Sequence, residues 1–427
     1  MSGRSIKTFM LGWEFPPFIS GGLGTACYGL TRAMDRLGIK VTFVLPRACS
    51  DRTAGDIKIL GGQESVGEMI SGNPANIKFR TITSRLKPYV DAGSYRYRLM
   101  RSRGGQTEKT NPGSKEAGGD NYGADIFSEV CCYADKATQI AAMEEFDIVH
   151  AHDWMTYPAG IAVSHISGKP LIVHVHSTEF DRSGEHVNQM VYDIERQGMH
   201  AAAKVVAVSN FTKGLIVRHY GVPPEKVEVV HNAVEPDDGG CLQTLVAKTS
   251  RIVLFLGRIT MQKGPEYFLA AAKKVLEVIE DVKFIMAGDG DMMTRSIELA
   301  AQLGIGHKVL FAGFLRGDDV KRAYRMADLY VMPSVSEPFG IATLEAMRQN
   351  VPVLVSRQSG IAEVIQHALK VDFWDINEMA NKIIAVLKRP PLKDTLGKNG
   401  FWESNRFRWE DSATRIRRIY EETLALA

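Results

Sequence analysis

Two cations in the second half of the chain have the type and spacing to bind an anionic ligand. Arg258 and Lys263 lie in the segment Gly-Arg-Ile-Thr-Met-Gln-Lys-Gly, between an apolar run typical of a buried strand and Pro265, a residue favoured at the first position of a helix. Because a helix N-terminus disfavours cations through its dipole, a pair of them there indicates an anion such as a diphosphate leaving group. Two solvated charges at a helix start are the alternative interpretation.

Two carboxylates follow a later apolar run, over residues 329–332, in Ser-Glu-Pro-Phe-Gly-Ile-Ala-Thr-Leu-Glu. Gly340 opens the predicted helix, whose first backbone N–H groups are free for an anion. We expect Glu337, in the loop, to face a cleft and Glu345, inside the helix, to lie within reach of a ribose diol. Glu337 taken alone also fits an ordinary carboxylate at a helix start.

A glycine-rich turn, Gly21–Gly24, separates the first predicted strand from the first predicted helix. Glycines let the backbone approach a ligand, and the helix N-terminus that follows attracts phosphate. Dinucleotide binding is disfavoured, because Cys27 breaks the G-x-G-x-x-G pattern and the second strand ends in Leu-Pro-Arg without a carboxylate for a ribose. A tight turn without a ligand stays open.

Alternate histidines, His150 and His152, follow another predicted strand in His-Ala-His-Asp-Trp. A metal site is disfavoured because no third-ligand pattern accompanies them. We expect a histidine that hydrogen-bonds a sugar hydroxyl from the cleft, with packing against the sheet as the alternative. Asp289 and Asp291 form a D-x-D motif, but their position after a strand predicts a turn and a helix cap. The sequence predicts no metal and no cofactor.

Strand-like and helix-like segments alternate along the whole chain, which predicts an α/β fold with parallel sheets. We expect two Rossmann-like doubly wound domains facing across a cleft, over residues 1–240 and 241–408, with a linker at about 234–249. A helix over 409–427 is expected to cross back to the first domain. The polar, glycine-rich stretch 104–123 fits either a functional lid or an idle insertion.

Composition narrows the class of protein. The chain has 427 residues, of which 45% are hydrophobic and 24% charged, and a net charge of +3, which gives no support for a nucleic-acid partner. No apolar run reaches the roughly 18 residues of a membrane helix. The five cysteines lack metal-ligand spacing, which favours a reduced, cytoplasmic protein. The oligomeric state is left open.

Together these motifs resemble the GT-B glycosyltransferases. The second half resembles the glycosyltransferase-4 family through Gly-Arg-x4-Lys-Gly, Ala-Gly-Asp-Gly and Pro-Ser-x-x-Glu-Pro-Phe-Gly-Ile-x-x-Leu-Glu-Ala. The first half resembles the glycogen and starch synthases through Glu-Phe-Pro-Pro, the turn at 21–24 and His-Ala-His-Asp-Trp. The chain departs from synthases that use ADP-glucose at Ile19, where they carry lysine, and at Gln358–Ile361, where they carry Thr-Gly-Gly-Leu.

The resemblance implies a role for each matched residue. Arg258 and Lys263 would hold the donor diphosphate, Glu337 would contact the transferred sugar and Glu345 the ribose. His152 would contact the sugar and support the transition state. The other donor contacts would be Gly340 and Ile341 at the phosphate, Gly313, Phe314 and Leu315 beside the base, and Gly21 and Gly22 over the phosphates.

The leading hypothesis is therefore a retaining, metal-independent α-glycosyltransferase that moves a hexose, expected to be glucose, from UDP- or ADP-glucose to a carbohydrate acceptor. Elongation of an α-glucan, as in the glycogen synthases, is one form of it. A glycosyltransferase acting on a small-molecule or cell-envelope acceptor, a nucleotide-sugar epimerase of the same architecture and a silent nucleotide-binding regulator are the alternatives. The sequence does not identify the acceptor.

Overall fold

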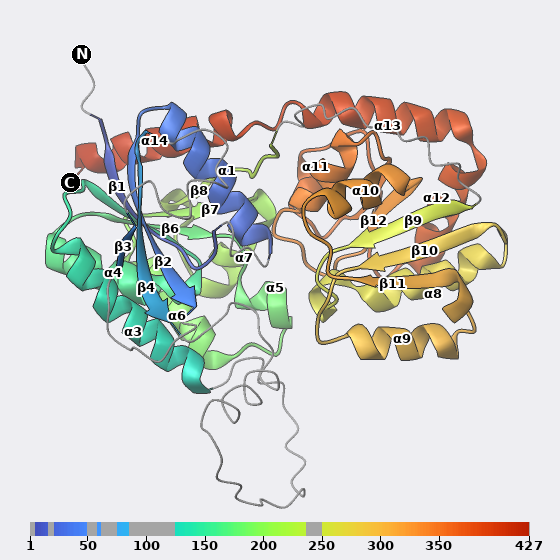
Figure 1. Cartoon of the computed structure of the whole chain (residues 1–427), viewed down its shortest axis with the longest axis horizontal. Coiled ribbons are helices and arrows are strands. Elements are labelled where there is room, and N and C mark those ends of the chain that lie inside the picture. Colours follow the sequence, from blue (N-terminus) through green and yellow to red (C-terminus); the bar gives the residue numbers. More distant parts are fainter. Residues whose placement is uncertain are drawn as a thin grey trace, which may run out of the picture.

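The structure, a computed structural model, describes residues 5–15, 21–48, 58–60, 75–84, 124–235 and 250–426. Ile19, the stretch 104–123 and residues 236–249 of the expected linker lie outside the described residues. The chain forms two α/β domains, each built on a sheet with helices on both faces (Figure 1). This confirms the predicted class of two Rossmann-like domains.

The first domain contains an eight-stranded sheet with the order β3-β4-β2-β1-β5-β6-β7-β8. The strands pair in parallel, apart from the antiparallel pair of β3 and β4. The central strands β5 and β6 are buried along their whole length, as expected for a sheet covered on both faces, although both contain histidine. The bounds are β1 (Lys7–Leu11), β2 (Lys40–Ala48), β3 (Lys58–Leu60), β4 (Ile77–Ser84), β5 (Ile148–His152), β6 (Leu171–Val175), β7 (Lys204–Ala207) and β8 (Val227–Val229).

Helices from both ends of the chain cover this sheet. One face is covered by α3, α4 and α6, and the other by α1 and the C-terminal helix α14. The bounds are α1 (Gly22–Arg36), α3 (Ala124–Ala141), α4 (Tyr157–Ser167), α5 (Glu179–Ser183), α6 (Gln189–Ala201), α7 (Asn210–Tyr220) and α14 (Trp409–Leu426). Helix α1 begins three residues before the predicted start, so Gly22 belongs to its first turn.

The second domain contains a six-stranded parallel sheet with the order β11-β10-β9-β12-β13-β14. Helices α8, α9 and α12 cover one face, and α10 and α11 cover the other. The strands are β9 (Arg251–Leu256), β10 (Val282–Ala287), β11 (Val309–Gly313), β12 (Leu329–Met332), β13 (Val353–Ser356) and β14 (Leu369–Val371). The helices are α8 (Pro265–Leu276), α9 (Met293–Gln302), α10 (Asp318–Met326), α11 (Ile341–Arg348), α12 (Ile376–Lys388) and α13 (Pro390–Ser404).

The last helix returns from the second domain to the first. Helix α13 lies over the second domain, whereas α14 lies over the first (Figure 1). Trp409 and Tyr420 of α14 are buried in the core that it shares with α1. A Cβ atom added at Gly29 of α1 would lie 2.2 Å from the Trp409 ring, so the helices meet at a position where only glycine fits. Among the described residues, no helix combines the length and apolar character needed to cross a bilayer.

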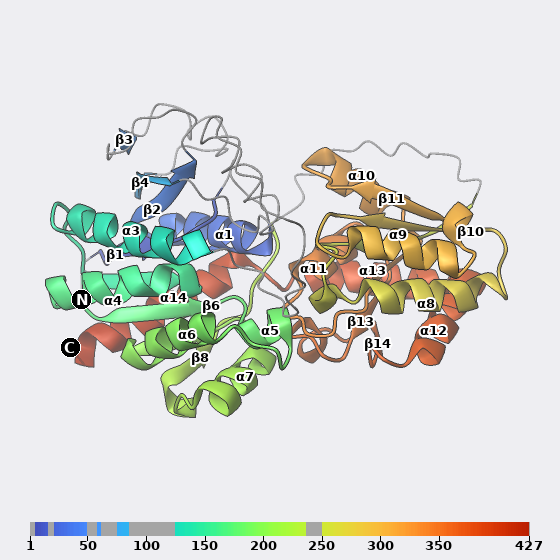
Figure 2. The same cartoon turned by 90° about the horizontal axis from the view of Figure 1, so that it is seen from below.

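The carboxyl ends of the strands in the two sheets face each other, and the loops that follow them touch (Figure 2). The hydroxyl of Ser336, after β12, donates to Asp181 in α5, after β6, at 2.5 Å. The Ser209 hydroxyl, after β7, donates to the Pro338 carbonyl at 2.6 Å. The Glu363 carboxylate accepts the backbone N–H of Asn210 at 2.8 Å. This interface is the place where open α/β sheets bind ligands.

Candidate active site

The predicted cation Lys263 and the predicted carboxylate Glu337 form an ion pair. Lys263 Nζ lies 2.5 Å from Glu337 Oε2, and the hydroxyl of Ser334 donates to the same oxygen at 3.1 Å. The loops after β9 and β12 approach so closely that a Cβ at Gly264 would lie 2.2 Å from the Pro333 carbonyl oxygen. Gly264 has a φ of +67°, so two constraints demand glycine beside this lysine.

Arg258 lies at the start of the loop that carries Lys263. Its guanidinium is half-buried and approaches the side-chain oxygen of Gln262 at 3.5 Å. Both cations therefore lie at the carboxyl edge of the second sheet, beside the loop that carries Glu337. An anion bound at this edge would meet two positive charges and one negative charge.

The N-terminus of α11 opens at the same edge. Gly340, its N-cap residue, has a φ of +107°, which an L side chain rarely adopts. Within the described part of the chain, no side chain caps this helix. Because the first N–H groups of a helix have no acceptor inside it, the backbone at Ile341 and beyond is suited to an anion.

Glu345, one turn further into α11, is held from the neighbouring helix. The Tyr324 hydroxyl of α10 donates to its carboxylate at 3.0 Å and to the Ala342 carbonyl at 3.1 Å. Burial raises the pKa of Glu345, and the Tyr324 hydrogen bond opposes that rise. The carboxylate is thus fixed in direction and keeps oxygen lone pairs for a diol.

The segment Gly313–Leu315 ends β11 with a sharp turn. Gly313 has a φ of +69°, and the pairing of β10 with β11 shifts register as it approaches this glycine. The Phe314 ring is 49% exposed and has the Arg316 guanidinium 5.2 Å from its centroid. Leu315 instead packs on the domain core. Phe314 is therefore the member of this segment that offers an aromatic face to a ligand.

On the first domain, Gly21 and Gly22 lie at the N-terminus of α1. A Cβ at Gly22 would meet no described atom within 4 Å. Buried Glu14 accepts the Gly24 backbone N–H at 3.2 Å and so already occupies part of the helix N-terminus. A phosphate there would have to share that N-terminus with a carboxylate.

The histidine that the sequence analysis placed in the cleft, His152, has no exposed surface. His176 lies over it, with His176 Nε2 2.9 Å from His152 Nδ1. His176 is partly exposed, so it is the ring of this pair that a sugar in the interface would meet. The sequence analysis missed His176, although the alternation His-Val-His along β6 and beyond was a signal for it.

His150, the other histidine of the motif, is also fully buried. Its Nδ1 lies 2.5 Å from the Tyr420 hydroxyl of α14. Burial lowers the pKa of His150 to about 3 and that of His176 to about 3, so both rings are neutral at neutral pH.

Two groups of side chains here have the donor chemistry to hold a metal, namely His150 with His152 and His174, and Cys27 with His152 and His176.

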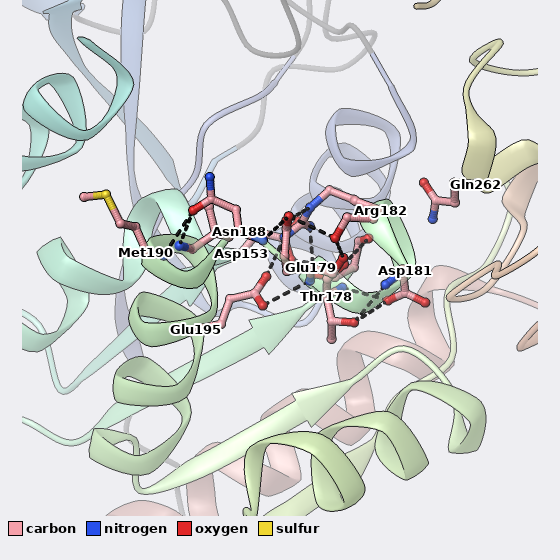
Figure 3. Close-up of polar contacts among 12 residues, drawn as sticks. Asp153, Thr178, Glu179, Asp181, Arg182, Asn188, Met190, Glu195 and Gln262 are labelled. Atoms are coloured by element: carbon pink, nitrogen blue, oxygen red, sulfur yellow. Dashed lines mark hydrogen bonds and ion pairs between the residues drawn. The ribbon is translucent and has the colours of Figure 1, made fainter. Parts of the chain in front are cut away.

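The sequence analysis also missed a buried charged cluster on α5 and α6, formed by Glu179, Arg182 and Glu195 (Figure 3). Arg182 donates to Glu179 at 3.1 Å and to Glu195 of α6 at 2.5 Å. The side chains of Asp181 and Thr178 close the start of α5 with reciprocal hydrogen bonds. One arginine thus holds two buried carboxylates in fixed directions at the domain interface.

Asp153 connects this charged cluster to the histidines. Its Oδ1 accepts the backbone N–H of His176 at 2.7 Å, and its φ of +58° is unusual for a residue other than glycine. Burial raises the pKa of Asp153 to about 7, against the opposing effects of Arg182 and the His176 N–H. Asp153 therefore fixes the backbone that carries the partly exposed histidine.

The D-x-D motif forms a turn, as predicted. Asp289 accepts the N–H of Gly290 at 2.8 Å, and its carbonyl accepts the N–H of Ile259. The expected helix cap is wrong, because α9 begins later, with Met292 as its N-cap residue and without a side-chain cap from the described residues.

Comparisons with known proteins match both halves of the chain. The family model described as "Glycosyltransferase Family 4" matches residues 126–238, and "Glycosyl transferases group 1" matches residues 243–420. The "Uncharacterized glycosyltransferase MJ1607" of Methanocaldococcus jannaschii is 30% identical over 85% of this chain and 83% of its own length. A D-inositol 3-phosphate glycosyltransferase of Acidothermus cellulolyticus is 27% identical over 69% of this chain and 72% of its own.

Solved structures agree on the fold. Sucrose-phosphate synthase from Thermosynechococcus elongatus superimposes with a TM-score of 0.73 and 20% identity, over 99% of this chain and 100% of its own. At that identity the likeness concerns the fold alone. Together with the sequence matches in both halves and the two facing Rossmann-like domains, it shows that this chain belongs to the GT-B glycosyltransferases, with the glycosyltransferase-4 pattern.

Proposed function

We propose that this chain is a retaining hexosyltransferase that takes glucose from a nucleoside-diphosphate glucose and passes it to a carbohydrate hydroxyl. The observation that carries the proposal is the pairing of Lys263 with Glu337 at 2.5 Å, beside Arg258 and the uncapped N-terminus of α11. Two cations and backbone N–H groups would stabilise the charge that develops on a departing diphosphate. The carboxylate would at the same point hold the hydroxyls of the hexose.

We assign the remaining donor contacts from the positions of these residues at the domain interface. Glu345, fixed by Tyr324, would bind the ribose diol, and the exposed Phe314 would lie beside the base. From the first domain, the side-chain-free backbone of Gly21 and Gly22 would lie over the phosphates. His176, rather than the buried His152, would touch the transferred sugar.

In the transfer step, the bond between C1 of the hexose and the diphosphate oxygen breaks as a bond forms from C1 to the acceptor oxygen. The acceptor proton passes to the leaving diphosphate, which assists attack on the same face and so retains the configuration. Arg258 and Lys263 supply positive charge at the diphosphate, so we expect transfer without added Mg²⁺ or Mn²⁺.

We compare two classes of acceptor, α-glucans and small phosphorylated polyols. The departures at Ile19 and Gln358–Ile361 weigh against an ADP-glucose-dependent α-glucan synthase, although glucan elongation stays in the proposal. One relative carries an inositol phosphate in its name, which adds small phosphorylated polyols as the second class.

The thiol of Cys131 is free and exposed, which fits a reducing compartment, and we place the reaction in the cytoplasm.

The test is a screen of UDP- and ADP-glucose against glycogen, maltooligosaccharides, sugar phosphates and inositol phosphates. Released nucleoside diphosphate is the readout, and NMR of the product reports the anomeric configuration. Acceptor-dependent release with an α-linked product is the expected result. Epimer formation from a UDP-sugar alone, an inverted product, or nucleotide binding without turnover would each contradict the proposal.

A further inference from the structure

Four histidines gather on one face of the first sheet, below the domain interface. Strands β5 and β6 pair in a register that sets His152 opposite His174. Because alternate residues of a strand point to the same face, His150 and His176 join them. The rings stack, with centroids 4.4 Å apart for His150 and His152 and 5.1 Å apart for His152 and His174.

Several ring nitrogens in this group have no hydrogen-bond partner among the described residues. They are His150 Nε2, His152 Nε2, both nitrogens of His174 and His176 Nδ1, and all of them are buried. A neutral imidazole carries one donor and one acceptor nitrogen, and buried polar groups are nearly always satisfied in folded proteins. So many orphaned nitrogens at one place indicate a missing partner that accepts several lone pairs at once.

We propose that His150, His152 and His174 bind a zinc ion. Their ligand nitrogens already lie within 4.8 Å of one another. A tetrahedral site with Zn–N bonds of about 2.0–2.1 Å sets its nitrogens roughly 3.4 Å apart. Zinc binding would therefore draw these nitrogens closer together than they now lie.

The surroundings of the three rings fit this assignment. Imidazoles must be neutral to bind a metal, and burial lowers the pKa of each of them. The Tyr420 hydroxyl holds His150 Nδ1, and His176 Nε2 holds His152 Nδ1, so the Nε2 atoms of both ligands remain for the metal. Such outer partners commonly orient zinc-bound histidines.

The other candidate group, Cys27 with His152 and His176, is the weaker one. Coordination there would replace the hydrogen bond between His152 and His176 and would use the partly exposed ring that we assign to the sugar. It would also leave both nitrogens of His174 without a partner, whereas the proposed site leaves one of them and His176 Nδ1. The zinc ion proposed here would have three protein ligands and a water in the fourth position, and it would tie β5 and β6 together beneath His176 and next to α14.

The sequence analysis expected no metal at His-Ala-His because no third ligand was visible. His174 supplies it from the next strand, 22 residues after His152 and directly opposite it in the sheet. The proposal concerns this buried ion alone, and we still expect the diphosphate end of the donor to need no divalent cation.

The experiment uses the full chain without a histidine tag. Protein stripped with a chelator is titrated with Zn²⁺, and the bound metal is measured by mass spectrometry. Co²⁺ serves as the spectroscopic probe, since a tetrahedral site gives intense visible absorption. We expect one tightly bound ion per chain, a tetrahedral cobalt spectrum without a thiolate band, and a higher melting temperature with Zn²⁺.

Variants then locate the site. His174→Ala and His150→Ala should each weaken zinc binding by at least about tenfold. Cys27→Ser and the surface control His307→Ala should leave it unchanged. If the histidine variants do not fold, the wild-type titration still decides. Wild-type protein that binds no zinc, unchanged binding in a folded His174→Ala, or loss of binding in Cys27→Ser would overturn the proposal.

Discussion

Replacing Lys263 by methionine should affect catalysis and stability through two different groups. The change removes a cation from the predicted diphosphate site, and the loss of one preorganised electrostatic contact lowers kcat roughly 10²–10³-fold. It also leaves Glu337, whose side chain is 8% exposed, with the hydroxyl of Ser334 as the remaining side-chain donor that we identify. Breaking a buried ion pair costs about 3–5 kcal/mol, and because the Lys263 side chain keeps 21% exposure we expect about 2–3 kcal/mol.

The double variant Lys263→Met, Glu337→Gln separates the two effects. The neutral amide no longer needs a counter-charge, so the free energy of unfolding should return to within about 1 kcal/mol of the wild type. Activity should not return, because the diphosphate has lost its cation and the hexose its carboxylate. Lys273→Met is the matched control, because this partly exposed lysine of α8 pairs loosely with Glu277 at 3.9 Å.

The assay measures nucleoside-diphosphate release at saturating acceptor, with urea denaturation of the same samples for the free energy of unfolding. If the double variant recovered more than half of the wild-type kcat/KM, the two residues would be a structural ion pair, and the assignment of the donor site would be refuted. A normal rate in the single variant would refute it as well.

Other substitutions test single features of the structure. Gly340→Ala should lower stability by about 1–2 kcal/mol because φ is +107°, and should weaken UDP binding in calorimetry. Phe314→Ala should raise KM for the donor while leaving kcat nearly unchanged, and the reverse pattern would argue against a contact with the base. The pKa of Glu363 is lowered, because hydrogen bonds from His231 and from backbone N–H groups outweigh the effect of burial. The contribution of Glu363 to stability should therefore be complete above pH 4.5 and should vanish as the pH falls through the folded pKa. In urea denaturation, the Glu363→Gln variant should lack this pH dependence. Gly29→Val should lower the melting temperature by several degrees because of the Trp409 ring, and an unchanged melting temperature would contradict the close contact of α1 with α14.

Local patterns in the sequence predicted most elements of the second domain. The strand Leu329–Met332 and the helix start at Pro265 lie where the apolar run and the proline indicate them. Parallel strands buried on both faces have nearly continuous apolar sequences, so this signal is strong. The loops after these strands carry Lys263 and Glu337, and the carboxyl-edge rule for open sheets brings them to one place.

In the first domain, local sequence patterns did not predict which side chains are buried or which of them touch. His-Ala-His was visible in the sequence, but its burial was not, because exposure depends on which ring of the neighbouring strand covers it. The pairing of β5 with β6 decided that His176 lies over His152 and that His174 completes a cluster of three ligands. The sequence did not predict the charged cluster around Arg182 for the same reason, since its carboxylates come from two separate helices, α5 and α6.

The sequence by itself determined the repeating β/α pattern, the apolar strands and the polar residues at their carboxyl ends, because each depends on neighbours within one element. The tertiary structure alone decided which side chains from separate elements touch. Lys263 meets Glu337 across 74 positions in the chain, and His150 meets Tyr420 across 270. Contacts over such separations are set by the packing of whole layers, for which no short stretch of sequence carries a signal.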